Sequence, residues 1–274
     1  MKRREIAGWT RSTIPAEGLA IYHRHGEDYW VDAGAAFYRE QLPGLVRVES
    51  ARTARVYRGS VDAAGCACYF KSYLRRDWSD TVKDAFRSSR ARRALLNEQM
   101  CSPLGFHLPR SLCLVEKMHG VGLTYCALIN EAVEDAPTLR DWLTREDLGL
   151  VNDRAGKRKM LCAFAGELGT WHAAGLHHGD LRLGNVLCRK HEGAYTFYWL
   201  DNERNQKFDV LPLRRRVHNL MRINFEPCGV DQTDRLRFWN AYLETAKLRA
   251  EDRESALSQT ISKTYERRKK RGWA

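Results

Sequence analysis

The segment from His177 to Asp201 constrains the fold of this chain more than any other part of its sequence. It begins with the run His-His-Gly-Asp-Leu-Arg-Leu-Gly-Asn-Val-Leu, directly after the end of a predicted long helix. A turn at residues 190–193 separates this run from a second, very apolar one that leads into Asp201. Two short apolar runs joined by a turn that contains glycine predict a β-hairpin. Such a hairpin would hold Asp180 and Asn185 at one base and Asp201 at the other, within one small volume.

This set of side chains suits phosphoryl transfer. One carboxylate must orient the attacking hydroxyl and accept its proton, while a carboxylate and an amide oxygen hold Mg²⁺ against a triphosphate. In this interpretation Asp180 is the base, Asn185 is a metal ligand and Asp201 is the main metal ligand. The run from His178 to Asn185 matches the kinase pattern H-R-D-L-x-x-x-N, with Gly179 in place of the arginine. Each side chain alone would be an ordinary loop or capping residue, but together, at this spacing, they favour catalysis.

Composition and charge narrow the class of protein. Apolar residues make up 43% of the 274 residues, enough to bury a sizeable core, and the formal net charge of +12 predicts an anionic partner. The longest stretch without a charged side chain, Met118–Asn130, has 13 residues, fewer than a membrane-spanning helix needs. No apolar segment follows the basic N-terminus as it would in a secretory signal. The eight cysteines form no zinc-binding pattern and indicate a reducing, cytoplasmic environment.

The two halves of the chain differ in character, which predicts an α+β fold with two lobes. The predicted strands are Tyr29–Val31, 53–60, Cys66–Tyr73, Leu112–Lys117 and Thr124–Asn130. The predicted helices are Asp84–Met100, Leu139–Leu143, Arg154–Ala174, Arg214–Asn224 and Thr233–Arg249. We therefore expect an N-terminal extension of unclear role at 1–50, a β-rich nucleotide-binding lobe with one key helix at 51–133, a mainly helical catalytic lobe at 134–250 and a basic C-terminal tail at 251–274.

The run HGDLRLGNVL followed by FYWLDNER resembles the lipopolysaccharide kinase (Kdo/WaaP) family of the protein-kinase-like phosphotransferases. The resemblance covers about residues 50–245. It implies a kinase-like fold, ATP and Mg²⁺ as cofactors, and a lipid-linked anionic glycan as the partner. It also implies that a sugar hydroxyl of the lipopolysaccharide inner core, on heptose or Kdo, is phosphorylated at the cytoplasmic face of the inner membrane.

The resemblance assigns further residues to the nucleotide. It implies that Lys71, on the strand Cys66–Tyr73, holds the α- and β-phosphates. Glu98 lies on the apolar stripe of its helix, where an acid needs a partner, and we expect it to pair with Lys71. The resemblance places the backbone carbonyl of Glu131 and the backbone amide of Val133 against adenine.

The sequence departs from protein kinases in several places. The segment Glu49–Gly59 lacks the G-x-G-x-x-G loop that covers the phosphates, and Asp201-Asn202-Glu203 stands where Asp-Phe-Gly is usual. No Ala-Pro-Glu follows, and Gly179 cannot pair with a phosphorylated activation loop as arginine does. These departures favour a small-molecule or glycolipid hydroxyl as the acceptor. Three residues could contact phosphate in place of the glycine loop, or lie at the surface: Arg52, Thr53 and Arg55.

The basic residues leave several interpretations open. Arg214–Arg216 and the basic tail Lys263–Arg271 suit an anionic glycan or an anionic membrane surface, and equally a solvated helix end. No nucleic-acid-binding motif is present, so nucleic acid is not the expected partner. Two other functions remain open at this point. An aminoglycoside- or choline-type phosphotransferase also uses an H-G-D motif, and the missing glycine loop would suit a non-catalytic pseudokinase.

Overall fold

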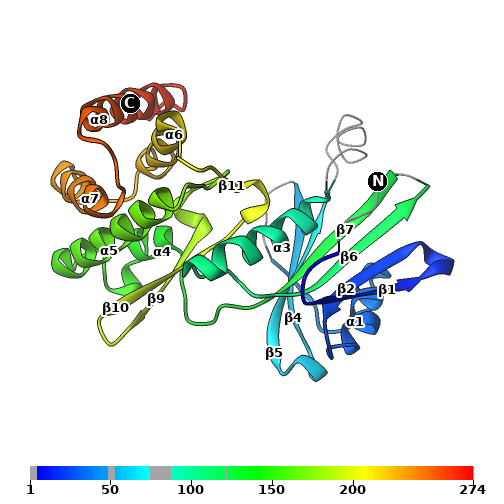
Figure 1. Ribbon diagram of the computed structural model, residues 1–274. Helices are drawn as coiled ribbons and strands as arrows, with labels where there is room; N and C mark the ends of the chain where they lie inside the picture. Colours follow the sequence, from blue (N-terminus) through cyan, green and yellow to red (C-terminus); the bar gives the residue numbers. More distant parts are fainter. Residues whose placement is uncertain (1–4, 49–52, 75–87, 121, 274) are drawn as a thin grey trace. The chain divides into compact units, whose positions relative to one another are not determined.

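The computed structural model describes residues 5–48, 53–74, 88–120 and 122–273 (Figure 1). The chain forms two compact units. Unit 1 comprises Met1–Cys101 and Pro109–Val133, and unit 2 comprises Ser102–Leu108 and Glu134–Ala274. Arg52 and the predicted helix start at Asp84 lie outside the described residues.

Unit 1 is built on an antiparallel sheet of seven described strands in the order β1-β2-β6-β7-β5-β4-β3. The strands are β1 (Trp9–Ile14), β2 (Leu19–Arg24), β3 (Val46–Val48), β4 (Ala54–Val61), β5 (Cys66–Tyr73), β6 (Ser111–His119) and β7 (Gly122–Glu131). The hairpin predicted for residues 53–73 is confirmed as β4 and β5, which pair from Val61 with Cys66. The strands predicted within β6 and β7 are confirmed as well.

Two helices cover opposite faces of this sheet, α1 (Tyr29–Tyr38) and α3 (Arg90–Cys101). Because side chains alternate between the faces of a strand, each helix meets its own set of strand residues. One apolar cluster joins α1 to side chains such as Ile21 and Phe70. A second cluster joins α3 to strand residues that point to the other face of the sheet, such as Leu114 and Leu128.

Residues 5–48 have a definite structural role in unit 1. Strands β1 and β2 extend the sheet because β2 pairs with β6 (Figure 1). The strand predicted at Tyr29–Val31 is wrong, since these residues begin α1. Trp30, Ala33 and Phe37 follow helical spacing and are all buried, so burial on one helical face explains the apolar run. Within 51–133, α3 is the α-helix that the described residues form, as expected, and α1 belongs to the N-terminal extension.

Unit 2 is mainly helical. Its α-helices are α4 (Leu139–Thr144), α5 (Arg154–Ala173), α6 (Leu213–Asn224), α7 (Gln232–Thr245) and α8 (Ala250–Lys269). Its strands form two small antiparallel pairs, β9 (Val186–His191) with β10 (Ala194–Trp199) and β8 (Leu176–His177) with β11 (Gln206–Lys207). Short 3₁₀ helices in the two units cover Pro15–Glu17, Asp62–Ala64, Ser102–Leu104, Glu146–Leu148, Leu183–Asn185 and Asn202–Arg204.

The β9–β10 hairpin confirms the hairpin predicted between His177 and Asp201. Trp199 pairs with Val186 at its base. Its two-residue turn, Glu192 and Gly193, has positive φ at both positions (47° and 76°), as the favoured hairpin turns require. The helices predicted in unit 2 are confirmed as α4 to α7, with ends within four residues of those expected. No helix in the described part of the chain is long and apolar enough to cross a membrane.

Candidate active site

Hydrogen bonds link the loop that carries Asp180 and Asn185 to the residue before Asp201. The Asn185 side-chain amide donates to the Asp180 carbonyl oxygen at 2.8 Å. The Leu200 backbone amide donates to the Asn185 carbonyl oxygen at 2.9 Å. Leu200 immediately precedes Asp201. The loop before β9 and the end of β10 are therefore joined, as the hairpin interpretation expected for Asp180, Asn185 and Asp201.

His178 lies behind this loop and is fully buried. Its Nδ1 accepts from the Asp180 backbone amide at 3.2 Å, so its Nε2 donates to the Leu200 carbonyl oxygen at 2.8 Å. Burial lowers the pKa of His178, although the charges of Asp201, Asp180 and Glu203 oppose that effect. A neutral imidazole with its proton on Nε2 therefore connects the two halves of the site.

Asn219, on α6, is a positioning residue that sequence reasoning missed. Its side-chain oxygen accepts from the His178 backbone amide at 3.1 Å, and its side-chain nitrogen donates to the His178 carbonyl at 2.7 Å. The same oxygen accepts from His172 Nε2 at 3.1 Å. Asn219 is fully buried at helical spacing from Arg216 and Ile223, which are also buried. An amide on the buried face of a helix was the signal available in the sequence.

Gly179 has a steric reason to be glycine. A Cβ atom at this position would lie 2.3 Å from both the Cβ and the carbonyl oxygen of Arg204. The Gly179 backbone amide donates to Asn205 Oδ1 at 3.3 Å, and Asn205 donates in turn to Asn202 Oδ1 at 2.8 Å. The segment after Asp201 thus packs directly against the backbone of the loop at residues 178–185, which we call the catalytic loop.

Asp180 is held between two arginines. Its Oδ1 accepts from Arg222 at 2.6 Å and from Arg182 at 3.1 Å, and Arg182 also reaches Oδ2 at 3.3 Å. The Arg222 side chain is 8% exposed, whereas that of Asp180 is 28% exposed. Burial first, and then repulsion from Arg182, lower the pKa of Arg222, while Asp180 opposes this. The Asp180 side chain is partly exposed, so it remains able to accept a hydrogen bond from a hydroxyl.

The Asn185 and Asp201 side chains suit a hard divalent cation. Because the Asn185 side-chain nitrogen is used by the Asp180 carbonyl, its Oδ1 faces away as an acceptor, and no described residue donates to it. Asp201 has a left-handed backbone (φ 55°, ψ 46°), which is uncommon outside glycine and concentrates at functional sites. Among the described residues there is no cluster of three His, Cys, Asp or Glu that could hold a metal alone. One carboxylate and one amide oxygen, completed by phosphate oxygens and water, are the type of site that Mg²⁺ uses.

In unit 1, Lys71 lies on the face of the sheet that α3 covers, since it pairs with Leu128 of the α3 cluster. Its ammonium group lies 5.1 Å from the centre of the Tyr73 ring. The expected Lys71–Glu98 ion pair does not form between these two described residues. Glu98 instead accepts from the Ser111 backbone amide at 2.8 Å and lies 3.6 Å from Arg24.

The strand order explains this correction. Ser111 is on β6 and Arg24 is on β2, whereas Lys71 is on β5, and β7 lies between β6 and β5. The C-terminal end of α3 therefore places Glu98 over the wrong strands for the pair. Burial raises the pKa of Glu98, and the Ser111 hydrogen bond and the Arg24 charge oppose that rise.

The remaining predicted contacts lie at other points of the fold. Glu131 ends β7, and Val133 is the last residue of unit 1. The Thr53 carbonyl oxygen accepts from Arg90 at 3.0 Å, and Arg55 lies 3.6 Å from Glu40. Neither observation assigns these residues to a phosphate.

Part of the arginine triplet and most of the basic tail take part in the internal structure of unit 2. Arg216 is buried and donates to the Tyr242 hydroxyl and to the Ala246 and His172 carbonyl oxygens, so it is no contact for an external anion. The basic segment from Lys263 lies mostly in α8, which packs against α6.

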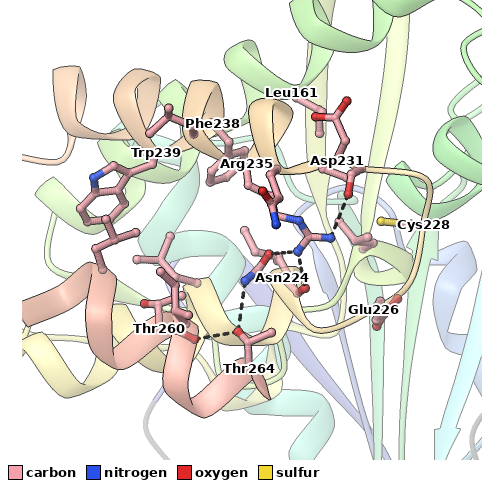
Figure 2. A pocket seen from close by; sticks show the side chains of 18 of the residues that line it. Leu161, Asn224, Glu226, Cys228, Asp231, Arg235, Phe238, Trp239, Thr260 and Thr264 are labelled. Atoms are coloured by element: carbon pink, nitrogen blue, oxygen red, sulfur yellow. Dashed lines mark hydrogen bonds between the residues drawn. The ribbon is translucent and has the colours of Figure 1, made fainter. Parts of the chain in front are cut away.

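Unit 2 also contains a large apolar pocket (Figure 2). Its volume is about 850 Å³, within the range of small-molecule sites. Its walls come from α5, α6, α7 and α8, and its apolar lining includes Leu161, Ile223, Phe238, Trp239 and Ile261. Figure 2 shows the hydrogen bond between Arg235 and Asn224, two of the residues that line it.

The sheet with a lysine on an inner strand, followed by the His-x-Asp loop and the hairpin that ends in aspartate, defines a protein-kinase-like phosphotransferase. The solved structure described as "WaaP in complex with acyl carrier protein" has this fold, with a TM-score of 0.66 at 18% identity over 90% of this chain and 98% of that one. A MAP kinase from Leishmania major matches with a TM-score of 0.41 at 16% identity, over 85% of this chain and 66% of that one. No curated protein gives a significant match.

The model of the lipopolysaccharide kinase (Kdo/WaaP) family matches residues 40–242. This chain belongs to that family, whose kinases phosphorylate sugar hydroxyls of the lipopolysaccharide core.

Proposed function

We propose that this protein transfers the γ-phosphoryl group of ATP to a hydroxyl of heptose or Kdo in the lipopolysaccharide inner core. The observation that carries the proposal is the hydrogen-bonded link from Asp180 through Asn185 to Leu200 and Asp201. It joins the loop of the proposed base to the two proposed metal-binding residues, and phosphoryl transfer requires such groups to be held close together.

Each residue has a defined task in this proposal. Asp180 orients the sugar hydroxyl and accepts its proton at Oδ2, whose bond to Arg182 is the longest of the three at 3.3 Å. Asn185 and Asp201 would hold Mg²⁺, which supplies positive charge to the phosphate oxygens. Lys71 would bind the phosphates, and the Glu131 carbonyl and Val133 amide would bind adenine. Glu98 would act on the nucleotide only through the position of α3, because its own contacts are with Ser111 and Arg24.

The test is phosphate transfer from labelled ATP by the purified protein. The acceptors are lipopolysaccharide cores that end at Kdo or at heptose, with an aminoglycoside and choline as soluble comparisons. We expect transfer to a core acceptor in the presence of Mg²⁺ and its loss in Asp201→Asn. Asp209→Asn is the matched control, since Asp209 is exposed and outside the hairpin. Transfer to the soluble amines alone, or full activity of Asp201→Asn, would overturn the proposal.

The acceptor is anchored in a membrane, and we propose that the reaction takes place at the cytoplasmic face of the inner membrane. The exposed side chains of Lys263, Lys269 and Lys270, on and after α8, would contact the anionic lipid surface. Each would contribute about 1 kcal/mol to the free energy of membrane binding. Sedimentation with vesicles containing anionic lipid tests this. Binding that is equal for neutral vesicles would contradict it.

We also propose acyl carrier protein as a protein partner. The support is the similar WaaP structure, which is in complex with acyl carrier protein, together with the apolar pocket of Figure 2, whose character suits a fatty acyl chain. The test compares the binding of acylated and unacylated acyl carrier protein. Ile261→Glu, at an exposed position of the lining, should weaken binding of the acylated form, whereas Val210→Glu, also exposed but outside the pocket, should not. Equal binding of both forms would contradict an acyl-binding pocket.

A further inference from the structure

A second pocket of unit 2 lies beside the proposed base. Its volume is about 360 Å³, and it is lined by five arginines, which we call the arginine pocket: Arg140, Arg182, Arg222, Arg267 and Arg271. Two of these, Arg182 and Arg222, are the arginines that bind the Asp180 carboxylate. The pocket therefore reaches the group that would receive the acceptor hydroxyl.

The positive charges of the pocket exceed its negative ones. Arg140 binds Glu226 at 2.6 Å, and the two arginines around Asp180 share one carboxylate. Arg267 and Arg271 have no acidic partner among the described residues. The Nε atom of Arg267 is buried and has no hydrogen-bond partner in the described part of the chain. Five guanidinium groups against Asp180 and Glu226 leave a net positive charge that an anion would balance.

Aromatic contacts hold the end of the chain at this pocket. Trp273 stacks on Phe225, with ring centres 5.6 Å apart and an angle of 14° between the planes. Arg267 lies over the same Phe225 ring at 4.6 Å, and Arg222 lies 5.8 Å from its centre. The guanidinium groups of Arg222 and Arg267 are thus packed against the Phe225 ring. Arg267, Arg271 and Trp273 all lie beyond the residues that the family model matches, 40–242.

We propose that the arginine pocket binds a phosphate or carboxylate group that the acceptor sugar already carries, and so holds the neighbouring hydroxyl at Asp180. This inference rests on the proposed function. Arginine forks match the planar carboxylate and the phosphate oxygens with paired hydrogen bonds, and they do so best where water is partly excluded. The C-terminal helix α8 then serves acceptor specificity, because it supplies Arg267 to the lining of the pocket.

The kinetic test uses Arg267→Gln and Arg271→Gln. The matched controls are Lys269→Gln and Lys270→Gln, which remove the same charge from exposed positions outside the pocket. Each variant is measured with a core acceptor that carries its phosphate or carboxylate and with the same acceptor after dephosphorylation or carboxyl reduction. The pair of treatments shows which of the two anions is recognised.

We expect both arginine variants to raise KM for the anionic acceptor about tenfold or more, with kcat, KM for ATP and thermal stability little changed. The neutralised acceptor should react poorly and equally with wild type and variants. Equal effects on both acceptor forms, the same effect in the lysine controls, or a rise confined to KM for ATP would overturn the proposal. The last outcome would indicate that the pocket holds nucleotide phosphates.

A binding measurement separates this inference from the proposed function. Inorganic phosphate and free Kdo are titrated into the wild-type protein and into the exposed-site variant Arg271→Gln, with Asp201→Asn as a reference that leaves the pocket intact. We expect binding by the wild type and by Asp201→Asn, and at least fivefold weaker binding by Arg271→Gln. If both probes bind equally to all three proteins, or to none, the arginine pocket is not an anion site, whatever activity the enzyme shows.

Discussion

Gly179 can be explained in two ways, by the absence of a kinase arginine and by the space that the fold leaves for a side chain. By sequence it is the loss of an arginine that protein kinases use to bind a phosphorylated loop. In the structure it is also the only residue that fits against the Arg204 backbone, where a Cβ would lie 2.3 Å from two atoms. The contact keeps the segment after Asp201 close to the catalytic loop.

We expect Gly179→Ala to lower the free energy of unfolding by about 2 kcal/mol or more, because Arg204 must move to relieve the overlap. Phosphoryl transfer should fall with it. Gly184→Ala is the control, since the nearest atoms to its Cβ, on the Arg140 side chain, are 3.8 Å and 3.9 Å away. Urea unfolding checks both variants. Equal stability of the two would show that the loops separate easily.

Substitutions of Asp180 should separate catalysis from stability. We expect Asp180→Asn and Asp180→Ala both to abolish transfer. Asp180→Ala should also cost about 1–3 kcal/mol of stability, because the buried Arg222 keeps its bond to the Leu181 carbonyl but loses its carboxylate partner, whereas asparagine retains an oxygen for that bond. Differential scanning calorimetry provides the measurement. A wild-type melting temperature for Asp180→Ala would mean that the ion pair contributes nothing.

At the scale of elements, helix α6 holds the catalytic loop in place through hydrogen bonds to its backbone. Asn219 reproduces the hydrogen bonds of a strand neighbour for His178, with one donor and one acceptor. The helix itself was predictable as Arg214–Asn224, and it is observed as Leu213–Asn224. Its role was not predictable, because Asn219 and His178 are 41 residues apart.

We expect Asn219→Ala to destabilise the protein by about 3 kcal/mol, since the buried backbone groups of His178 lose their partners. The catalytic loop would then lose its fixed position, and kcat should fall more than KM rises. Arg214→Ala, at an exposed position on the same helix, is expected to leave both unchanged. Hydrogen exchange of the His178 amide tests the mechanism, and unchanged protection in Asn219→Ala would refute it.

For the whole molecule, buried neutral histidines set the response to acid. Burial lowers the pKa of both His172 and His177 to about 3, from an ordinary value of 6.5. Between these values the unfolded chain binds more protons than the folded one, so stability is complete above pH 6.5 and falls as the pH decreases toward 3.

We therefore expect the urea midpoint to fall between pH 7 and pH 5.5, above the range in which most carboxylates titrate. Each such histidine contributes at most about 1.4 kcal/mol per pH unit. His177→Leu should flatten this slope, because it removes one group, and its Nδ1 has no hydrogen-bond partner among the described residues. Exposed His191→Asn should leave the slope unchanged. A slope that His177→Leu does not alter would rule out this histidine as a cause.

The sequence by itself determined the β9–β10 hairpin and, with it, the link from Asp180 through Asn185 to Leu200, the residue before Asp201. Those signals are local: a turn, two apolar runs and a fixed spacing. Only the tertiary structure decided that Glu98 contacts β2 and β6 instead of Lys71, and that the end of α8 supplies Arg267 to the pocket that Arg182 and Arg222 line. These contacts join residues that are distant in the chain. Hydrophobic periodicity predicts local helices and strands, but it does not indicate which distant residue a side chain will contact.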